Sequence, residues 1–542
     1  MRIQPEILKI IGWMIVVFII RIIGIKHGLP GIYHPDEPIV VSRAVNVIIN
    51  GDLNPHFFHW PSLLMNLLAL EYEIIYLIGK LTGSFNNTED FFRYYSLYKG
   101  NFHLWGRVLI TLMGTGFSYF LFLTVKIWLD RKTAFLAVLI SIFIPFLIKH
   151  SHFITPDIPA LFFASVSIYL LSKYYFSEKR DSLLYWASVM AGLSTATKYN
   201  YALMIVPVLI ILFANNPQKF SKKLIISAGL IISMLVAFLI FNPFILLDFK
   251  TFAQQFKEIS LHMKEGHIGM EAKSHPSIDL LKHAVSGTSV IIFAGALIGM
   301  IISLNKNRIW AITLISFPLL ILLSHGRWPV TADRYAIPLL IFVLSFFPVT
   351  LQLLYQRFSK SKSISRYLII ILLAFALPFS SCAQIIDEHL KTDTREVARK
   401  WINQNIPAGS KLALEKDGPY MQLQHANSTY HNDPAYLFII ITPWYGSSFR
   451  TKESPMEMLV KNKPEYVVVN SGVYSRYEPG APSETAFPDV YKIWRNYYDS
   501  LDAIGDLQYE ISPSKKFTGP TVKIYHIPDD SYDLIKPVLP DD

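Results

Sequence analysis

The chain has 542 residues, of which 52% are hydrophobic and only 17% are charged, and its mean hydropathy is +0.34. This composition is too apolar for a soluble protein of that length and indicates a protein that crosses the membrane many times. The net charge of +10 does not indicate nucleic-acid binding, because excess lysine and arginine in a membrane protein usually lie in cytoplasmic loops. The single cysteine, Cys382, excludes a disulfide or zinc framework within one chain.

Eleven apolar runs are predicted as membrane helices. They are 7–25, 104–125, 133–149, 157–172, 183–197, 201–213, 223–241, 284–304, 309–324, 335–354 and 367–385. Every second loop is short and basic, as between the second and third runs, so we expect a cytoplasmic N-terminus and an extracytoplasmic C-terminal segment. The first run lacks a small-residue cleavage site, so we interpret it as a retained helix of a plasma (inner) membrane protein.

The segment 183–213 is an almost unbroken apolar stretch of 31 residues with basic flanks, so it must cross an even number of times. It is too short for two helices of about 20 residues each, the length that a bilayer requires. We therefore expect a hairpin of short helices whose turn, 197–200, stops near the outer headgroup level. Lys198 in this turn is either a lysine that extends its ammonium to the interface or a cation that meets a lipid phosphate.

The first outer loop, 26–103, contains two predicted interfacial helices, 38–50 and 61–80. Asp36 and Glu37 precede the first of them, between two prolines. Acids at this position can cap a helix. A pair of carboxylates beside a membrane helix is costly unless it is solvated, paired or functional, and we favour a catalytic role.

Asp157 begins the fourth predicted helix on the same side of the membrane and can also act as a cap. Two outward acidic sites fit a glycosyl acceptor site. One carboxylate would remove the proton from a hydroxyl, and the others would position that hydroxyl and support positive charge at the sugar carbon.

A sugar carried on a lipid phosphate would leave behind an anionic group that needs cations or a metal. The expected phosphate-binding residues on the outer face are Lys198, Arg334, Arg327 and His59, with Arg93 and Arg107 as further candidates. We expect His34, His152 and Tyr199 to contact the acceptor or the sugar. The histidines could instead bind a divalent metal, but no metal-binding spacing is present, so no cofactor is firmly predicted.

The composition changes at about residue 386, which divides the chain into a membrane part, 1–385, and a C-terminal domain, 386–542. The pattern predicts helices at 393–409 and 486–505, strands at 410–415 and 464–472, and a terminal hairpin of 507–512 with 521–527. We therefore expect an extracytoplasmic α/β domain after a polytopic α-helical membrane part.

These features together resemble the GT-C glycosyltransferases that use polyprenyl-phosphate sugars, the superfamily of protein O-mannosyltransferases and lipid A aminoarabinose transferases (families 39 and 83). The resemblance lies in six stretches that follow one another through the membrane part: HPDEP (34–38), FHWPSLL (58–64), SHFITPDIPALFF (151–163), GLSTATKYNYAL (192–203), NPFILLDFKTF (242–252) and DRYAIPLL (333–340).

The resemblance implies a GT-C fold and an inverting single displacement on the outer face, with Asp36 as general base, Glu37 and Asp157 assisting, and Lys198 contacting phosphate. It implies a polyprenyl-phosphate-sugar donor and a glycan, lipid or protein acceptor. One alternative is an oligosaccharide ligase or oligosaccharyltransferase-like enzyme, which would have a larger, metal-containing site. The other is a transporter, which the absence of an internal sequence repeat disfavours.

Overall fold

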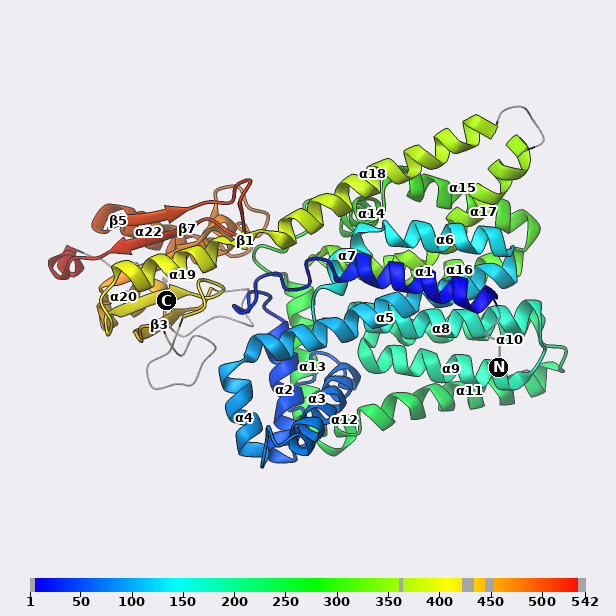
Figure 1. The fold of residues 1–542 in the computed structure, drawn as a ribbon, viewed down its shortest axis with the longest axis horizontal. Coiled ribbons are helices and arrows are strands. Elements are labelled where there is room, and N and C mark those ends of the chain that lie inside the picture. The colour runs from blue at the N-terminus through cyan, green and yellow to red at the C-terminus, as the bar shows by residue number, and fades with distance from the viewer. Residues whose placement is uncertain (1–4, 360–363, 422–432, 444–452, 535–542) are drawn as a thin grey trace.

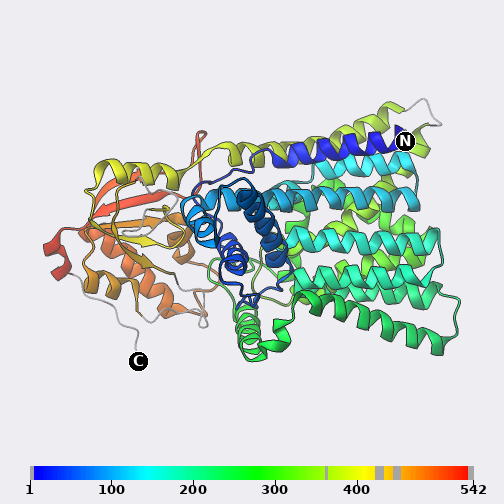
Figure 2. The same ribbon diagram turned by 60° about the horizontal axis from the view of Figure 1, so that its bottom comes forward.

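The computed structural model describes residues 5–359, 364–421, 433–443 and 453–534. Its long helices run side by side in one bundle (Figures 1 and 2), with a domain of strands and helices beyond one end of that bundle. The N-terminus lies at the opposite end.

Each of the eleven predicted runs coincides with helix in this bundle. The helices are α1 (Pro5–Ile22), α5 (Lys99–Trp128), α6 (Arg131–Ile142), α8 (Asp157–Phe176), α9 (Asp181–Thr197), α10 (Ile205–Asn215), α11 (Phe220–Phe241), α15 (Val290–Lys306), α16 (Arg308–His325), α17 (Leu340–Ser359) and α18 (Ile364–Leu390). Short 3₁₀ segments, η1 (Tyr199–Met204) and η2 (Asp333–Leu339), precede α10 and α17.

Five of the described helices are long and apolar enough to cross a membrane, or seven if each of two bent pairs forms one span. In the first pair α6 and α7 (Pro145–Ser151) meet at 57°, and in the second α14 (Pro276–Ser286) and α15 meet at 108°. Pro145 accounts for the first bend, because a proline disfavours helical backbone in the residue before it. A polytopic helical membrane protein is confirmed, whereas eleven crossings remain a prediction.

Glycines allow close contact between neighbouring helices of the bundle. A Cβ at Gly192 of α9 would lie 2.4 Å from the carbonyl oxygen of Met234 in α11, and one at Gly299 of α15 would lie 2.0 Å from that of Phe346 in α17. Small residues at such crossings let backbones approach, which is how membrane helices gain packing contacts. Substitution at either glycine is therefore expected to separate the two helices.

The loops that the sequence predicts to be outside fold into further helices at the end of the bundle nearest the second domain (Figure 2). They are α2 (Glu37–Asn50), α3 (Leu63–Leu81) and α4 (Thr88–Leu97) in the first loop, and α12 (Phe244–Leu247) and α13 (Phe249–Glu265) in a later one. The two helices predicted for the first loop are confirmed as helices.

The second domain contains a five-stranded sheet in the order β3-β2-β4-β7-β5. The strands are β2 (Lys411–Glu415), β3 (Leu437–Ile441), β4 (Tyr466–Asn470), β5 (Asp506–Ile511) and β7 (Val522–His526). The pairs β2–β3 and β2–β4 are parallel, whereas β7 is antiparallel to both β4 and β5, which confirms the predicted hairpin. A small parallel pair, β1 (Thr392–Asp393) with β6 (Phe517–Thr518), lies beside it.

Helices cover both faces of this sheet, which explains why β2 and β4 are buried along almost their whole length. Helix α19 (Thr394–Asn405) packs on one face, and α20 (Pro455–Asn462) and α22 (Pro488–Ile504) pack on the other. Of these helices, α19 and α22 are the two that the sequence predicts. The composition of the domain is thus α/β, as expected.

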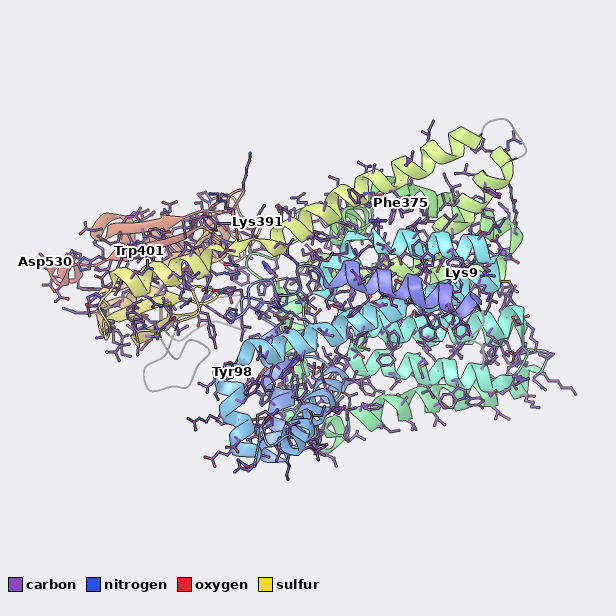
Figure 3. All side chains as sticks on the ribbon, in the orientation of Figure 1. Lys9, Tyr98, Phe375, Lys391, Trp401 and Asp530 are labelled. Carbon is purple, nitrogen blue, oxygen red and sulfur yellow. The ribbon has the colours of Figure 1, made fainter. Side chains whose placement is uncertain are left out.

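The two parts of the chain are connected at several places. Helix α18 continues to Leu390, past the predicted boundary, and Lys391 follows at the junction that Figure 3 labels. The loop between α13 and α14 also reaches the second domain, where its Ile268 is fully buried in the core that α20 and α22 form with the sheet. The predicted division at 385/386 stays a prediction.

Candidate active site

Two acidic side chains from different parts of the chain each pair with a cation at the domain-facing end of the bundle. Asp36, at the N-terminus of α2, forms an ion pair with Arg334 of η2. Asp157, the first residue of α8, forms an ion pair with Lys198, which lies in the turn between α9 and η1. The side chains of Asp36 and Arg334 are 17% and 23% exposed, so this first pair is partly exposed to solvent.

Tyr335 brings these two ion pairs into one cluster. The Lys198 Nζ lies 5.4 Å from the centre of the Tyr335 ring, and the Arg334 Cζ lies 6.0 Å from it. Arg334 also interacts electrostatically with both carboxylates, Asp36 and Asp157. We call these five residues the acid–base cluster. Asp36 and Asp157 thus lie on the same side of the bundle, as the sequence predicts.

The local sequence explains how each member is held. Pro38 at the start of α2 and Pro156 before α8 both favour a helix beginning there, so each acid lies at a helix N-terminus. Lys198 adopts extended backbone (φ −150°, ψ 119°) where the short α9 ends. This is the turn that the length of the apolar segment predicts.

Glu37 lies next to Asp36 in the chain but has a different environment. Its carboxylate is fully buried and accepts hydrogen bonds from Arg107 Nε at 2.8 Å, Arg107 Nη2 at 2.6 Å and the Ile154 N–H at 2.9 Å. Burial alone would raise the pKa of Glu37, but the charge and hydrogen bonds of Arg107 outweigh this and lower it to about 2. Glu37 is therefore held as an anion inside the protein.

The residues expected to contact the sugar lie in different places, and of the two histidines only His34 is beside the cluster. His34 accepts a hydrogen bond from the Asp36 N–H at 3.3 Å and stacks on Phe153, so it lies beside the cluster. His152 is fully buried, with its two ring nitrogens 2.7 Å from the Arg21 carbonyl and 2.6 Å from His389.

Tyr199 follows Lys198 directly, but its hydroxyl donates to the Phe58 carbonyl at 3.1 Å. This bond joins the turn after α9 to the first outer loop.

The other two expected phosphate ligands do not pair with the acids of the cluster. His59 faces Glu258 of α13, with 3.9 Å between Nε2 and Oε2. Arg327 is exposed, and within the described part of the chain no carboxylate lies in ion-pair distance of it. Lys198 and Arg334 are thus the predicted cations that the fold brings together.

Further polar residues lie next to the cluster. Asp333 accepts a hydrogen bond from Lys149 Nζ at 2.6 Å and lies 3.6 Å from His150 Nε2. His325 contacts Asn200 Nδ2 at 2.9 Å and packs on the Trp328 ring at 4.2 Å. Of these residues, the sequence indicated Asp333 as a possible partner of Arg334 and His150 as a histidine flanking the acids. Over the residues described, no three His, Cys, Asp or Glu side chains are grouped as a metal site requires.

Comparison with known protein families gives one match. Residues 99–246 match the family described as dolichyl-phosphate-mannose-protein mannosyltransferase. This segment is similar to that family. It runs from the start of α5 into α12, and therefore includes Arg107, Asp157 and Lys198 but not Asp36.

Solved structures show the same fold over the whole chain. Apo ArnT from Cupriavidus metallidurans has 13% identity and a TM-score of 0.57, with 96% of this chain and 97% of that chain covered. ArnT bound to undecaprenyl phosphate has 13% identity and a TM-score of 0.55, with 96% and 98% covered. The apo oligosaccharyltransferase of Archaeoglobus fulgidus has 12% identity and a TM-score of 0.50, with 90% and 71% covered. Among curated protein sequences, none matches.

The predicted resemblance to GT-C enzymes is confirmed by the family match and the fold, and so is the class of activity: the protein is a membrane glycosyltransferase. The transporter alternative is thereby set aside. Identities of 12–13% show the fold alone, so the site residues, sugar and acceptor are argued from this chain's own geometry.

Proposed function

We propose that the protein transfers a sugar from a polyprenyl-phosphate donor to an acceptor hydroxyl, by inverting single displacement at the acid–base cluster. The observation that carries this proposal is that two carboxylates and two cations lie around one tyrosine at the end of the membrane bundle. A lipid phosphate at headgroup level requires the cations, and an attacking hydroxyl requires a carboxylate.

In this mechanism Asp36 is the general base. Before substrate binds, its carboxylate forms an ion pair with Arg334. The acceptor oxygen attacks the anomeric carbon as its proton passes to Asp36. The bond between that carbon and the phosphate oxygen breaks, and the electron pair leaves with the phosphate. One bond forms and one breaks at the same carbon, so the configuration inverts.

Lys198 and Arg334 would bind the departing phosphate. Arg334 can offer two parallel N–H groups to phosphate oxygens, and Lys198 adds a compact charge. Because both cations are already paired with Asp36 and Asp157, donor binding would draw them partly away from these acids. This exchange would free the Asp36 carboxylate to accept a proton only once the donor is bound.

Orientation follows from the basic loops. The helix ends near Lys126, Lys179, Lys223 and Arg308 lie at the end of the bundle away from the second domain. By the positive-inside rule that end is cytoplasmic. The acid–base cluster and the C-terminal domain then lie on the extracytoplasmic side. The membrane is the plasma (inner) membrane.

The test uses Asp36→Asn and, as a matched control, Asp52→Asn, an exposed acid in the same loop. Mass spectrometry of lipids that co-purify with the protein identifies the donor headgroup, and transfer is then measured with that lipid. We expect Asp36→Asn to lower transfer by at least 100-fold, within the usual 10²–10⁴-fold contribution of general-base catalysis. Undecaprenyl phosphate binding should persist. Normal turnover in Asp36→Asn would remove this residue from the role.

The oligosaccharyltransferase-like alternative keeps one supporting observation, the similarity of the fold to that enzyme from A. fulgidus. Such an enzyme would take a diphosphate-linked glycan at a metal-containing site. Transfer that is lost with EDTA and restored by Mn²⁺ would favour it over the proposed mechanism.

A further inference from the structure

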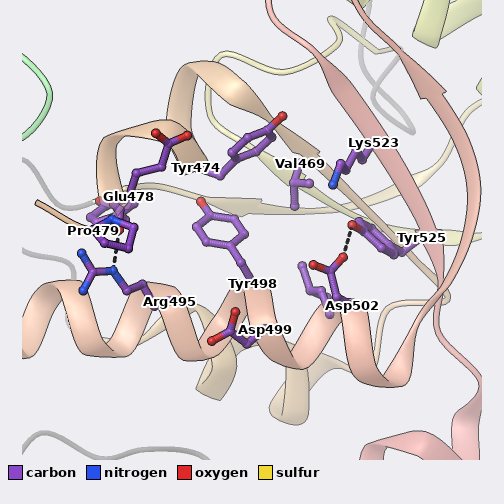
Figure 4. A pocket seen from close by; sticks show the side chains of 12 residues that line it. Val469, Tyr474, Glu478, Pro479, Arg495, Tyr498, Asp499, Asp502, Lys523 and Tyr525 are labelled. Atoms are coloured by element: carbon purple, nitrogen blue, oxygen red, sulfur yellow. Dashed lines mark hydrogen bonds between the residues drawn. The ribbon is translucent and has the colours of Figure 1, made fainter. Parts of the chain in front are cut away.

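A cavity of about 330 Å³ lies in the C-terminal domain, well apart in sequence from the acid–base cluster. Figure 4 shows it between the sheet and helix α22. This volume is at the lower end of the usual range for small-molecule sites, about 300–1,000 Å³. The cavity therefore suits a compact ligand.

The sequence pattern explains why polar and aromatic groups line this cavity. Arg495, Tyr498, Asp499 and Asp502 are spaced three or four residues apart and so share one face of α22. On the sheet, alternate residues of β7 point to the same face, which brings Lys523 and Tyr525 opposite that helix.

The segment after β4 closes the cavity with Tyr474, at the end of the short helix α21 (Ser471–Tyr474), and with Glu478 and Pro479. Each wall thus contributes a tyrosine, and α22 and this segment contribute acids.

The tyrosine rings are held in place from behind. The Tyr498 hydroxyl donates to Glu415 Oε1 at 2.7 Å, and Glu415 Oε2 accepts from the Asn470 N–H at 2.8 Å. The Tyr525 hydroxyl donates to Asp502 at 2.6 Å. The rings of Tyr474 and Tyr498 meet edge to face with 6.0 Å between centres. These contacts fix the rings, which reduces the entropy lost when a ligand binds.

The acids differ in what they already bind. Asp502 is occupied by Tyr525, whereas within the described residues the Glu478 and Asp499 side chains accept no hydrogen bond. Both acids are exposed, and carboxylates accept hydrogen bonds and cannot donate them, so they favour a ligand with hydroxyl or amino donors.

An anionic ligand is disfavoured by the charges in this cavity. Of its two cations, Arg495 is committed to Glu484 and the Tyr477 carbonyl, and three carboxylates face the same space. A phosphate or nucleotide would therefore meet net repulsion.

We propose that this cavity binds a saccharide, a neutral or amino sugar, whose C–H faces pack on Tyr474 and Tyr498 and whose hydroxyl groups donate to Glu478 and Asp499. A pyranose ring has an apolar face and a rim of donors, which is what fixed aromatic rings beside accessible carboxylates recognise.

The position of the cavity relative to the membrane part indicates which saccharide this is. Arg476, in the wall-forming loop, packs against Gly269, and Ile268 beside it enters the domain core. His267 in the same loop interacts electrostatically with Arg334. The cavity wall is therefore connected through one short loop to the acid–base cluster. Resting on the proposed transferase function, we assign the cavity to part of a glycan acceptor.

The test is saturation-transfer difference NMR of the full-length protein in nanodiscs, with a panel of glucose, mannose, galactose, N-acetylglucosamine and glucosamine. We expect at least one sugar to bind. Binding should weaken by about tenfold in Tyr474→Ala, the usual scale for loss of an aromatic anchor, and also in Asp499→Asn, a surface change that leaves the fold intact.

Two control variants distinguish loss of binding in the cavity from a general effect of substitutions in the domain. Tyr509→Ala removes a tyrosine that stacks on Trp401 on the other face of the sheet, at 4.8 Å, and Asp506→Asn alters an exposed acid outside the cavity. Both should bind sugar as the wild type does.

Asp36→Asn should also keep sugar binding, so a failure of the proposed transfer mechanism would be seen separately. The inference is overturned if no sugar of the panel binds, or if binding is unchanged in Tyr474→Ala and Asp499→Asn.

Discussion

Arg107 binds Glu37 through both ends of its guanidinium, from Nε to Oε1 and from Nη2 to Oε2, with both side chains almost completely buried. The remaining nitrogen, Nη1, donates to the carbonyls of Ile25 and His27 at 2.9 and 2.8 Å. One arginine of α5 thus fixes the chain on both sides of Asp36. We propose that Glu37 assists catalysis as a positioning residue, by holding its neighbour where the acceptor arrives.

Removal of this arginine should strongly lower the stability of the protein. Arg107→Ala leaves the Glu37 carboxylate buried without its partner, which typically costs about 3–5 kcal/mol. We expect a marked fall in the melting temperature of the detergent-solubilised protein. As a control, Arg93→Ala changes an exposed arginine of the neighbouring helix α4, and this variant should melt like the wild type. Equal melting of the two variants would contradict a structural role for the buried pair.

Variants of Arg334 test whether this residue binds the donor phosphate. Arg334→Lys keeps the charge but loses the paired N–H geometry, so kcat/KM for the donor should fall by roughly tenfold, and Arg334→Ala should be lower still. Arg327→Ala, at an exposed position nearby in sequence, should stay within about threefold of the wild type because it lacks contact with the cluster. Transfer assays at several donor concentrations measure these values, and the reverse ranking would shift the phosphate site toward Arg327.

Lys198 should act mainly on donor binding. Lys198→Ala removes a charge proposed to meet the phosphate, and we expect about tenfold weaker binding of undecaprenyl phosphate, measured by native mass spectrometry. Lys198→Arg should restore part of this affinity because it keeps the charge. Lys282→Ala, another lysine paired with an aspartate but exposed, serves as the control. Unchanged lipid binding in Lys198→Ala would exclude the proposed contact.

The raised pKa of Glu415 predicts that the stability of the C-terminal domain depends on pH. Burial raises the pKa of Glu415 from 4.5 to about 8, although hydrogen bonds from Asn470 and Tyr498 partly oppose this. The folded domain therefore retains a proton that the unfolded chain has lost, and its stability should decrease as the pH rises from about 4.5 through 8.

Thermal melts followed by tryptophan fluorescence between pH 5 and 8.5 measure this effect. Glu415→Gln should flatten the decline, and Glu510→Gln, an exposed acid on β5, should leave it in place. An identical pH profile for the wild type and Glu415→Gln would show that Glu415 does not titrate in this range.

The helices were predictable because apolar length is a direct consequence of the bilayer, and the turn at Lys198 followed from a segment too short for two full spans. The grouping of Asp36 with Asp157 followed from their position at outer helix starts. The ion-pair partners of these acids could not be predicted from the sequence, because Asp36 and Arg334 are 298 positions apart and Glu37 and Arg107 are 70 apart. Burial of His152 likewise depends on packing against α18, which its local sequence does not encode.

The buried position of Ile268 has a consequence for engineering. A chain cut after α18 would expose this isoleucine to water, and the severed domain would keep an unfilled hole in its core. A chimera that exchanges the C-terminal domain with that of a relative should therefore also exchange residues 266–275. If that segment is left behind, the hybrid should express poorly even when the linker after Leu390 is joined without error.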